Sequence, residues 1–300
     1  MALATAIGPF ASGIRDQGAF ILQLDSHQHF WRPSRGDYGW LTPDLVPLYR
    51  DFVPGDLAPL LDRHGIAGTV LVQAAPTVAE TEYLLAVAAK APFVKGVVGW
   101  AGFDQPGGPA DIERLAADPR LKGMRPMIQD IADPEWMLRP AFAQSIATLE
   151  HSGLAFDALL RPEHLGPFKR FLKLYPNLPI VLDHGAKPAI AAGRLDAGPF
   201  DRWARDIREI AWDRRLRCKI SGLATEAPAG WQPADLDPYL DVLLESFGPA
   251  RLMWGSDWPV VEMAGGYDLW RKTALDYFAR LSEDERRAIL GETAVAFYRL

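Results

Sequence analysis

Eight short apolar segments recur along the 300-residue chain, and each is followed by a stretch that can form a helix. Several segments are apolar almost throughout, as at residues 70–72 and 180–182, which is typical of strands buried on both faces of a parallel sheet. The pattern predicts strands at residues 21–25, 69–73, 94–100, 121–127, 154–160, 179–183, 216–220 and 251–255.

Residues that cap helices stand between these strands. Asp56 precedes an apolar helical pattern that Gly65 closes, and Thr77 with Glu80 forms a T-x-x-E capping box. Alternation of strand and helix, repeated eight times, predicts a single-domain α/β fold, the (β/α)8 TIM-type barrel. An open doubly wound sheet is the alternative, but no G-x-G-x-x-G and no Walker motif follows any of the strands.

Composition and charge limit the kind of protein further. A net charge of -6 without long basic runs argues against nucleic acid as a partner. No apolar run approaches the ~18 residues that a membrane span needs. Residues 20–300 show no linker and are expected to form one domain. Residues 1–19 lack the features of a signal peptide and read as an N-terminal extension. With a single cysteine, Cys218, the chain suits a reducing compartment, and we expect it in the cytoplasm.

The first predicted strand ends in Asp25-Ser26-His27-Gln28-His29. Side chains alternate along a strand, so His27 and His29 point to the same side and Gln28 points away. Two histidines at the carboxyl end of a barrel strand suit a metal ion or a polarised carbonyl. Histidines that only pack and form hydrogen bonds are an equally good explanation of this pair taken alone.

Other predicted strands also end in polar side chains, and in a barrel these ends meet at one mouth. Strand two offers Gln73, strand four Arg125, strand five Asp157, strand six His184 and strand eight Asp257. Gln73 and Asp157 are, with Arg125, candidate substrate-binding residues. Gln73 can also be a satisfied buried amide, and Asp157 a group that orients an arginine. Barrel closure brings strand eight beside strand one, so Asp257 and the histidine pair are expected to be neighbours.

Two tryptophans lie next to these candidates. Trp31 follows His29 by two positions, and Trp258 follows Asp257 directly. An aromatic ring at the mouth of a barrel can cover a flat or cyclic substrate and exclude water, so both are candidate substrate-binding residues. An aromatic lid without substrate contact is the alternative.

Four motifs at predicted strand ends carry a family resemblance, namely DSHQHFW at 25–31, KGMR at 122–125, LDH at 182–184 and MWGSDWP at 253–259. In combination they resemble the amidohydrolase superfamily over nearly the whole chain. The branch that is most similar contains sugar-acid lactonases together with pyrone-dicarboxylate lactonase. The resemblance implies a barrel hydrolase that opens a cyclic ester, a small-molecule substrate and no membrane or nucleic-acid partner.

The chain departs from the two-metal members of that superfamily. The position of their bridging lysine holds Met124 and Arg125, and strand five offers Asp157 in place of a histidine. The resemblance therefore implies one divalent ion at most, with zinc favoured and His27, His29 and Asp257 as its ligands. Some lactonases of this branch use no metal, so the need for an ion stays open.

The expected reaction is hydrolysis of a sugar-acid lactone of the L-fuconolactone kind to its aldonic acid, with Asp257 as general base and His27, His29 and His184 around the carbonyl. Arg125 would bind a carboxylate or neighbouring hydroxyls. A pyrone-dicarboxylate or muconolactone hydrolase, or a metal-dependent decarboxylase, would need several arginines. A barrel that only binds a ligand is the third alternative.

Overall fold

The computed structural model describes residues 22–192 and 197–300, and the predicted N-terminal extension lies outside them. All eight predicted strands are present, at β1 Leu24–Gln28, β2 Gly68–Val72, β3 Val94–Gly99, β4 Leu121–Met124, β5 Ala155–Ala158, β6 Ile180–Leu182, β7 Arg217–Ile220 and β8 Leu252–Trp254. Helices follow them at α1 Pro54–His64, α2 Val78–Ala88, α3 Gly108–Ala116, α4 Phe142–Ser152, α5 Leu165–Leu174, α6 Ala197–Ile210, α7 Pro233–Phe247 and α8 Gly266–Phe278, and short helices α9 Glu283–Arg287 and α10 Thr293–Tyr298 end the chain.

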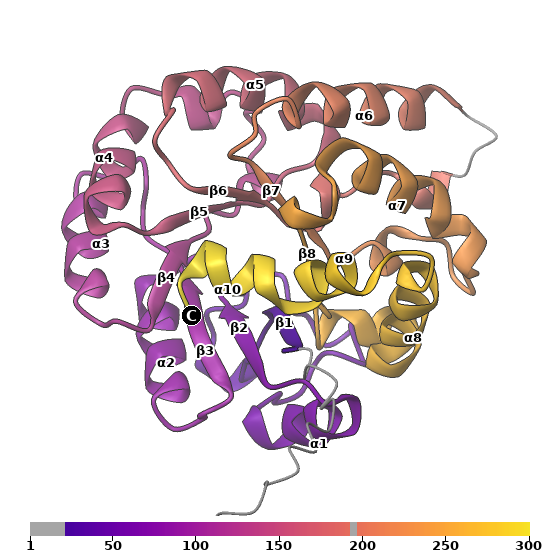
Figure 1. The fold of residues 1–300 in the computed structure, drawn as a ribbon. Helices are drawn as coiled ribbons and strands as arrows, with labels where there is room; N and C mark the ends of the chain where they lie inside the picture. Colours follow the sequence, from indigo (N-terminus) through magenta and orange to yellow (C-terminus); the bar gives the residue numbers. More distant parts are fainter. Residues whose placement is uncertain (1–21, 193–196) are drawn as a thin grey trace, which may run out of the picture.

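The strands form one parallel sheet in sequential order from β1 to β8, surrounded by the helices (Figure 1). Beyond β8 the chain pairs with β1, because the Asp257 amide donates to the His27 carbonyl over 2.8 Å and the His29 amide donates to the Trp258 carbonyl over 2.7 Å. These bonds close the sheet at its carboxyl end. The (β/α)8 barrel prediction is therefore confirmed, and the doubly wound alternative is wrong.

The amino-terminal end of the barrel is filled with apolar side chains. Strand residues such as Leu24, Val70 and Val181 pack there against Tyr298 of α10, which lies across the barrel in Figure 1. With this end packed, the carboxyl ends of the strands are left for a site, as in other barrels of this type. In the described ranges no helix is long and apolar enough to span a membrane.

Two local expectations need correction. The first strand runs over Leu24–Gln28 in place of 21–25, so His27 lies within the strand and His29 directly after it. In the predicted capping box, the Thr77 hydroxyl does accept from the Glu80 amide over 3.1 Å. The Glu80 carboxylate, however, accepts from the amides of Ala74 and Ala75, which follow β2 and would otherwise be buried without a partner.

Candidate active site

His27 lies fully buried in β1 and faces charged groups on both sides of its ring. Its Nδ1 is 3.1 Å from Lys219 Nζ and 3.5 Å from an Asp183 oxygen. Its Nε2 is 3.3 Å from a guanidinium nitrogen of Arg125 and 3.7 Å from Oδ1 of Asp257. The His27 ring thus joins the interior of the barrel to the carboxylate at its mouth.

The position of Asp257 follows from the closure of the barrel between β8 and β1. Asp257 has a left-handed backbone (φ 58°), and its amide is fixed on the His27 carbonyl. Just before it, Gly255 lets the two chains approach closely, because a Cβ there would lie 2.7 Å from Cβ of His27. The expectation that Asp257 and the histidine pair are neighbours is confirmed.

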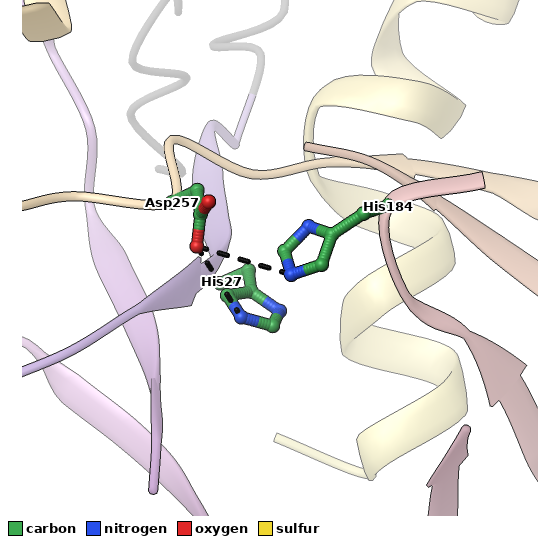
Figure 2. Close-up of side chains that lie close together, drawn as sticks. All are labelled: His27, His184 and Asp257. Atoms are coloured by element: carbon green, nitrogen blue, oxygen red, sulfur yellow. Dashed lines mark ion pairs between the residues drawn. The ribbon is translucent and has the colours of Figure 1, made fainter. Parts of the chain in front are cut away.

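His184 comes from the turn after β6, and its ring points toward Asp257 (Figure 2). Nδ1 of His184 is 2.9 Å from the Ser221 hydroxyl, and Nε2 is 3.9 Å from Asp257 Oδ1. Ser221 was not a sequence candidate, although it follows β7 at the same end of the barrel. Its hydroxyl fixes the orientation of the His184 ring.

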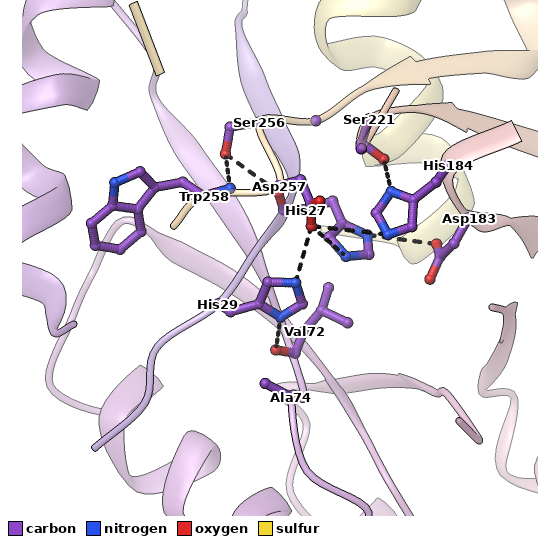
Figure 3. A network of polar contacts seen from close by, with 12 residues as sticks. His27, His29, Val72, Ala74, Asp183, His184, Ser221, Ser256, Asp257 and Trp258 are labelled. Carbon is purple, nitrogen blue, oxygen red and sulfur yellow. Dashed lines mark hydrogen bonds and ion pairs between the residues drawn. The ribbon is translucent and has the colours of Figure 1, made fainter. Parts of the chain in front are cut away.

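His29 makes a contact that needs more than a neutral imidazole. Its Nδ1 is 2.8 Å from the Val72 carbonyl oxygen and its Nε2 is 3.2 Å from Asp257 Oδ1 (Figure 3). A neutral imidazole carries one N–H, so it can donate to only one of these two acceptors. When the Nδ1–H group donates to Val72, the contact between Nε2 and Asp257 requires an additional proton or a cation between the two atoms.

The donor atoms at the barrel mouth fit a divalent cation. Ligand atoms of His27, His184 and Asp257 all lie within 4.8 Å of one another, and all three residues are buried. Two imidazoles and a carboxylate are a donor set that zinc hydrolases use. The sequence prediction named His29 as the third ligand, and the structure groups His184 with His27 and Asp257 in its place. Nε2 of His29 lies beside the same oxygen of Asp257.

The protonation states of these groups follow from burial and from their neighbours. Burial lowers the pKa of His184 to about 4. Burial and the Lys219 ammonium lower the pKa of His27 well below its usual value, and burial also lowers the pKa of His29. Burial alone would raise the pKa of Asp257, but the imidazole of His184 and the hydrogen bond to His29 outweigh it and hold that pKa below the usual range. At neutral pH the site therefore combines an ionised Asp257 with neutral imidazoles.

Arg125 lies at the same mouth, held by three groups. Its guanidinium donates to the Gln73 carbonyl and lies 3.5 Å from Asp183 and 3.3 Å from His27 Nε2. The Gln73 side chain returns a 2.7 Å hydrogen bond to the Arg125 carbonyl, so Gln73 lies behind Arg125 and positions it. Arg125 and a metal ion would compete for the same His27 nitrogen.

Lys219 is a functional candidate that the sequence analysis missed. It is fully buried in β7 and pairs with Asp157 over 2.6 Å and with Asp183 over 3.1 Å. Asp157 also accepts from the Tyr298 hydroxyl over 2.6 Å, so it lies beneath the site. A lysine inside the apolar run 216–220 was a usable signal, because a charge buried in a barrel strand needs partners.

A cavity of about 190 Å³ opens above these groups. This is smaller than the roughly 300–1,000 Å³ of pockets for drug-sized molecules, so it suits a single small ring. Among the candidates from the sequence, the cavity is lined by His29, Trp31, Arg125, His184 and Asp257. The other lining residues were not predicted from the sequence, and they are Trp40, Ala74, Met127, Gln129, Asp130, Leu159, Lys187 and Val260.

The two tryptophan candidates differ in position. Trp31 lines the cavity, but it is fully buried and its indole N–H is bound by the carbonyls of Leu48 and Arg50. Trp258 does not line it and packs edge-on against Phe52. Trp40, which is 36% exposed and donates to the Ala74 carbonyl over 2.7 Å, is the aromatic residue at the open side.

Two histidines and an aspartate meet at the carboxyl ends of the strands of a closed (β/α)8 barrel. This is where barrel enzymes have their active sites, so the fold and the site together indicate an enzyme of this class. Residues 24–300 match the sequence pattern of the amidohydrolase family. The chain belongs to this family.

Relatives extend over nearly the same length. The chain is 42% identical to an L-fucono-1,5-lactonase of Burkholderia ambifaria over 284 residues, covering 93% of this chain and 96% of that protein. It is 36% identical to an L-fucono-1,5-lactonase of Burkholderia multivorans, with the same coverage. A crystal structure of a Burkholderia multivorans amidohydrolase with bound zinc superimposes with a TM-score of 0.87 at 36% identity, covering 93% of this chain and 99% of that one.

Proposed function

We propose that this protein hydrolyses the lactone of a sugar acid, of the L-fuconolactone kind, to the open aldonic acid. The observation that carries the proposal is the ionised Asp257 facing three imidazoles at the base of a cavity sized for one ring. Relatives of known activity, 42% and 36% identical over most of the chain, support the same reaction class.

Asp257 acts as the base in this mechanism. A lactone is an ester, so hydrolysis requires that water attacks the carbonyl and that the ring oxygen leaves as a hydroxyl group. The buried carboxylate of Asp257 takes a proton from the attacking water and returns it to the ring oxygen when the C–O bond breaks. Its low pKa keeps it ionised in the resting enzyme.

Cationic and N–H groups stabilise the oxyanion that forms on the carbonyl. The Arg125 guanidinium and the imidazole of His184 lie beside Asp257, and the neutral His27 accepts from Arg125 at Nε2 and holds it there. Preorganised donors in a site that excludes water are worth about 10²–10³-fold in rate each. Gln73 and Asp183 hold Arg125, while Lys219 and Asp157 support His27 from inside the barrel.

A divalent ion, with zinc favoured by the donor set, would be held by Asp257, His27 and His184, with His29 beside it, and would polarise the carbonyl and acidify the water. Trp31 and Trp40 supply the apolar wall for the ring, and Trp258 fixes the Asp257 segment from behind. The single cysteine, Cys218, is buried and unpaired, which suits the cytoplasm that we propose as its compartment.

The alternative substrates carry more negative charge than this cavity accommodates. Within the described residues the cavity is lined by two side chains with a fixed positive charge, Arg125 and Lys187. Arg125 is already engaged by Asp183 and Lys187 by Glu226. A pyrone dicarboxylate would need a free cation for each carboxylate, so the neutral sugar lactone is favoured.

The test is a panel of L- and D-aldonolactones with a pyrone dicarboxylate, followed with a pH indicator because each turnover releases a proton. We expect turnover of L-aldonolactones with a kcat/KM well above that for the pyrone. Faster turnover of the pyrone would favour the alternative. Binding without turnover of any lactone would refute hydrolysis.

A further inference from the structure

The turn that follows β6 has an unusual backbone. His184, Gly185, Ala186 and Lys187 all have positive φ angles, of 53°, 55°, 61° and 48°. For residues with a Cβ the left-handed conformation costs about 1–2 kcal/mol each, and it normally occurs at single positions. Three of these four residues carry a Cβ, so the surrounding structure must hold the turn in place.

Buried hydrogen bonds hold this left-handed turn. The Lys187 amide donates to the His184 carbonyl over 2.9 Å, and the indole N–H of Trp203 donates to the Gly185 carbonyl over 2.8 Å. As a result, His184 and Lys187 both line the cavity. The strained turn places two side chains at the same cavity, which suggests a role for each of them. The mechanism described above uses only His184.

The ammonium of Lys187 has its charge balanced by Glu226 but has more N–H donors than this pair uses. Its side chain is 18% exposed, and Nζ pairs with Glu226 over 3.2 Å. An ammonium group has three N–H donors. Among the described residues Glu226 is the only ion-pair partner of Lys187, and this one pair does not use all three donors of a residue that lines the cavity. Arg125, in contrast, is surrounded by Gln73, Asp183 and His27.

Lys187 lines the cavity without an ion pair to the proposed base. In the part of the chain that the structure describes, its ammonium pairs with Glu226 of the loop after β7 and not with Asp257. A sugar lactone carries hydroxyl groups around its ring, and a hydroxyl oxygen accepts readily from an ammonium. We propose that Lys187 binds a ring hydroxyl of the lactone and sets the preference for hydroxylated over deoxygenated lactones. This inference rests on the proposed function.

The experiment compares Lys187→Met with Glu226→Gln, which keeps the ammonium, on an aldonolactone and on a series of deoxy-lactones that each lack one hydroxyl. We expect Lys187→Met to raise KM for the full substrate roughly 10- to 100-fold with kcat nearly unchanged, since a charged hydrogen bond is lost. For one deoxy-lactone the variant and the wild type should have the same kcat/KM. Lys187→Arg should recover part of the loss, and Glu226→Gln should lose far less than Lys187→Met.

Equal losses on every lactone, or equal losses in Lys187→Met and Glu226→Gln, would show that the pair only ties two loops together and would overturn the inference. Thermal unfolding of each variant identifies any loss of folded protein. If the wild type opens no lactone, the proposed function fails. If the wild type is active and Lys187→Met retains its KM, only the inference about Lys187 fails.

Discussion

The ammonium nitrogen of Lys219 lies 3.1 Å from Nδ1 of His27, and both side chains are fully buried. Lys219 also forms ion pairs with the carboxylates of Asp157 and Asp183, which have no access to water. The active-site imidazole of His27 therefore rests on a buried cluster of charges.

Removal of Lys219 should destabilise the protein strongly. In Lys219→Met the buried carboxylate of Asp157 loses its cation and Asp183 keeps only Arg125 at 3.5 Å, and breaking a buried pair in this way costs about 3–5 kcal/mol. Urea unfolding of the wild type and the variant measures the difference in their free energies of unfolding. The double variant Lys219→Met, Asp157→Asn should recover part of the loss, because one uncompensated charge is removed with it. A loss below about 1 kcal/mol, the range of an exposed pair, would contradict this assignment.

Gly222 is predicted to be required for the orientation of His184. A Cβ at Gly222 would lie 2.5 Å from Nδ1 of His184, and Gly222 has a positive φ of 62°. Gly222→Ala should displace the ring and lower kcat/KM by about 10²-fold, as misplacement by about 1 Å can. Gly230→Ala is the matched control, because Gly230 has a φ of 72° and no atom within 4 Å of its Cβ position. Similar activities of the two variants would refute the prediction.

Glu80 should make stability depend on pH. Burial raises the pKa of Glu80 from 4.5 to about 7. The folded state then binds more protons than the unfolded state between these values, so its stability falls as the pH rises from about 4.5 to 7. The glutamine of Glu80→Gln cannot ionise. The free energy of unfolding of this variant should therefore rise relative to that of the wild type by up to about 3 kcal/mol between pH 4.5 and 7. Urea unfolding at several pH values gives the difference, and a difference that is independent of pH would disprove it.

Metal removal tests the donor set of His27, His184 and Asp257. Nitrogen atoms of His27 and His29 lie beside one oxygen of Asp257, and a cation there would bind all three atoms. We therefore expect a chelator to lower kcat/KM and added zinc to restore it. His184→Asn should weaken zinc binding in calorimetry. Full activity of protein with no measurable metal content would show that Arg125 and the histidines are sufficient without an ion.

The sequence predicted the barrel because strands buried on both faces have a strong apolar signal. It also placed His27, His184 and Asp257 together, since strand ends meet at one mouth in this fold. The exact start of β1 was wrong by three residues, because the apolar run and the strand do not coincide there.

Contacts that depend on the turn after β6 or on the interior of the barrel could not be predicted. Lys187 reaches the cavity only through four left-handed residues, three of which are not glycine. The role of Gln73 behind Arg125 and the pairing of Asp157 with Lys219 depend on which side of a strand each side chain occupies. Trp40 lies in a long loop after β1 whose path has no periodic signal.

The most direct test of the account is kcat/KM for an L-aldonolactone in Asp257→Asn beside Asp268→Asn. Asp268 is an exposed carboxylate that pairs with His64 over 2.6 Å, so the control removes a chemically similar pair outside the site. The account predicts a loss of about 10³-fold or more for Asp257→Asn, within the range of a lost general base, and near wild-type activity for Asp268→Asn. Wild-type activity in Asp257→Asn would contradict it.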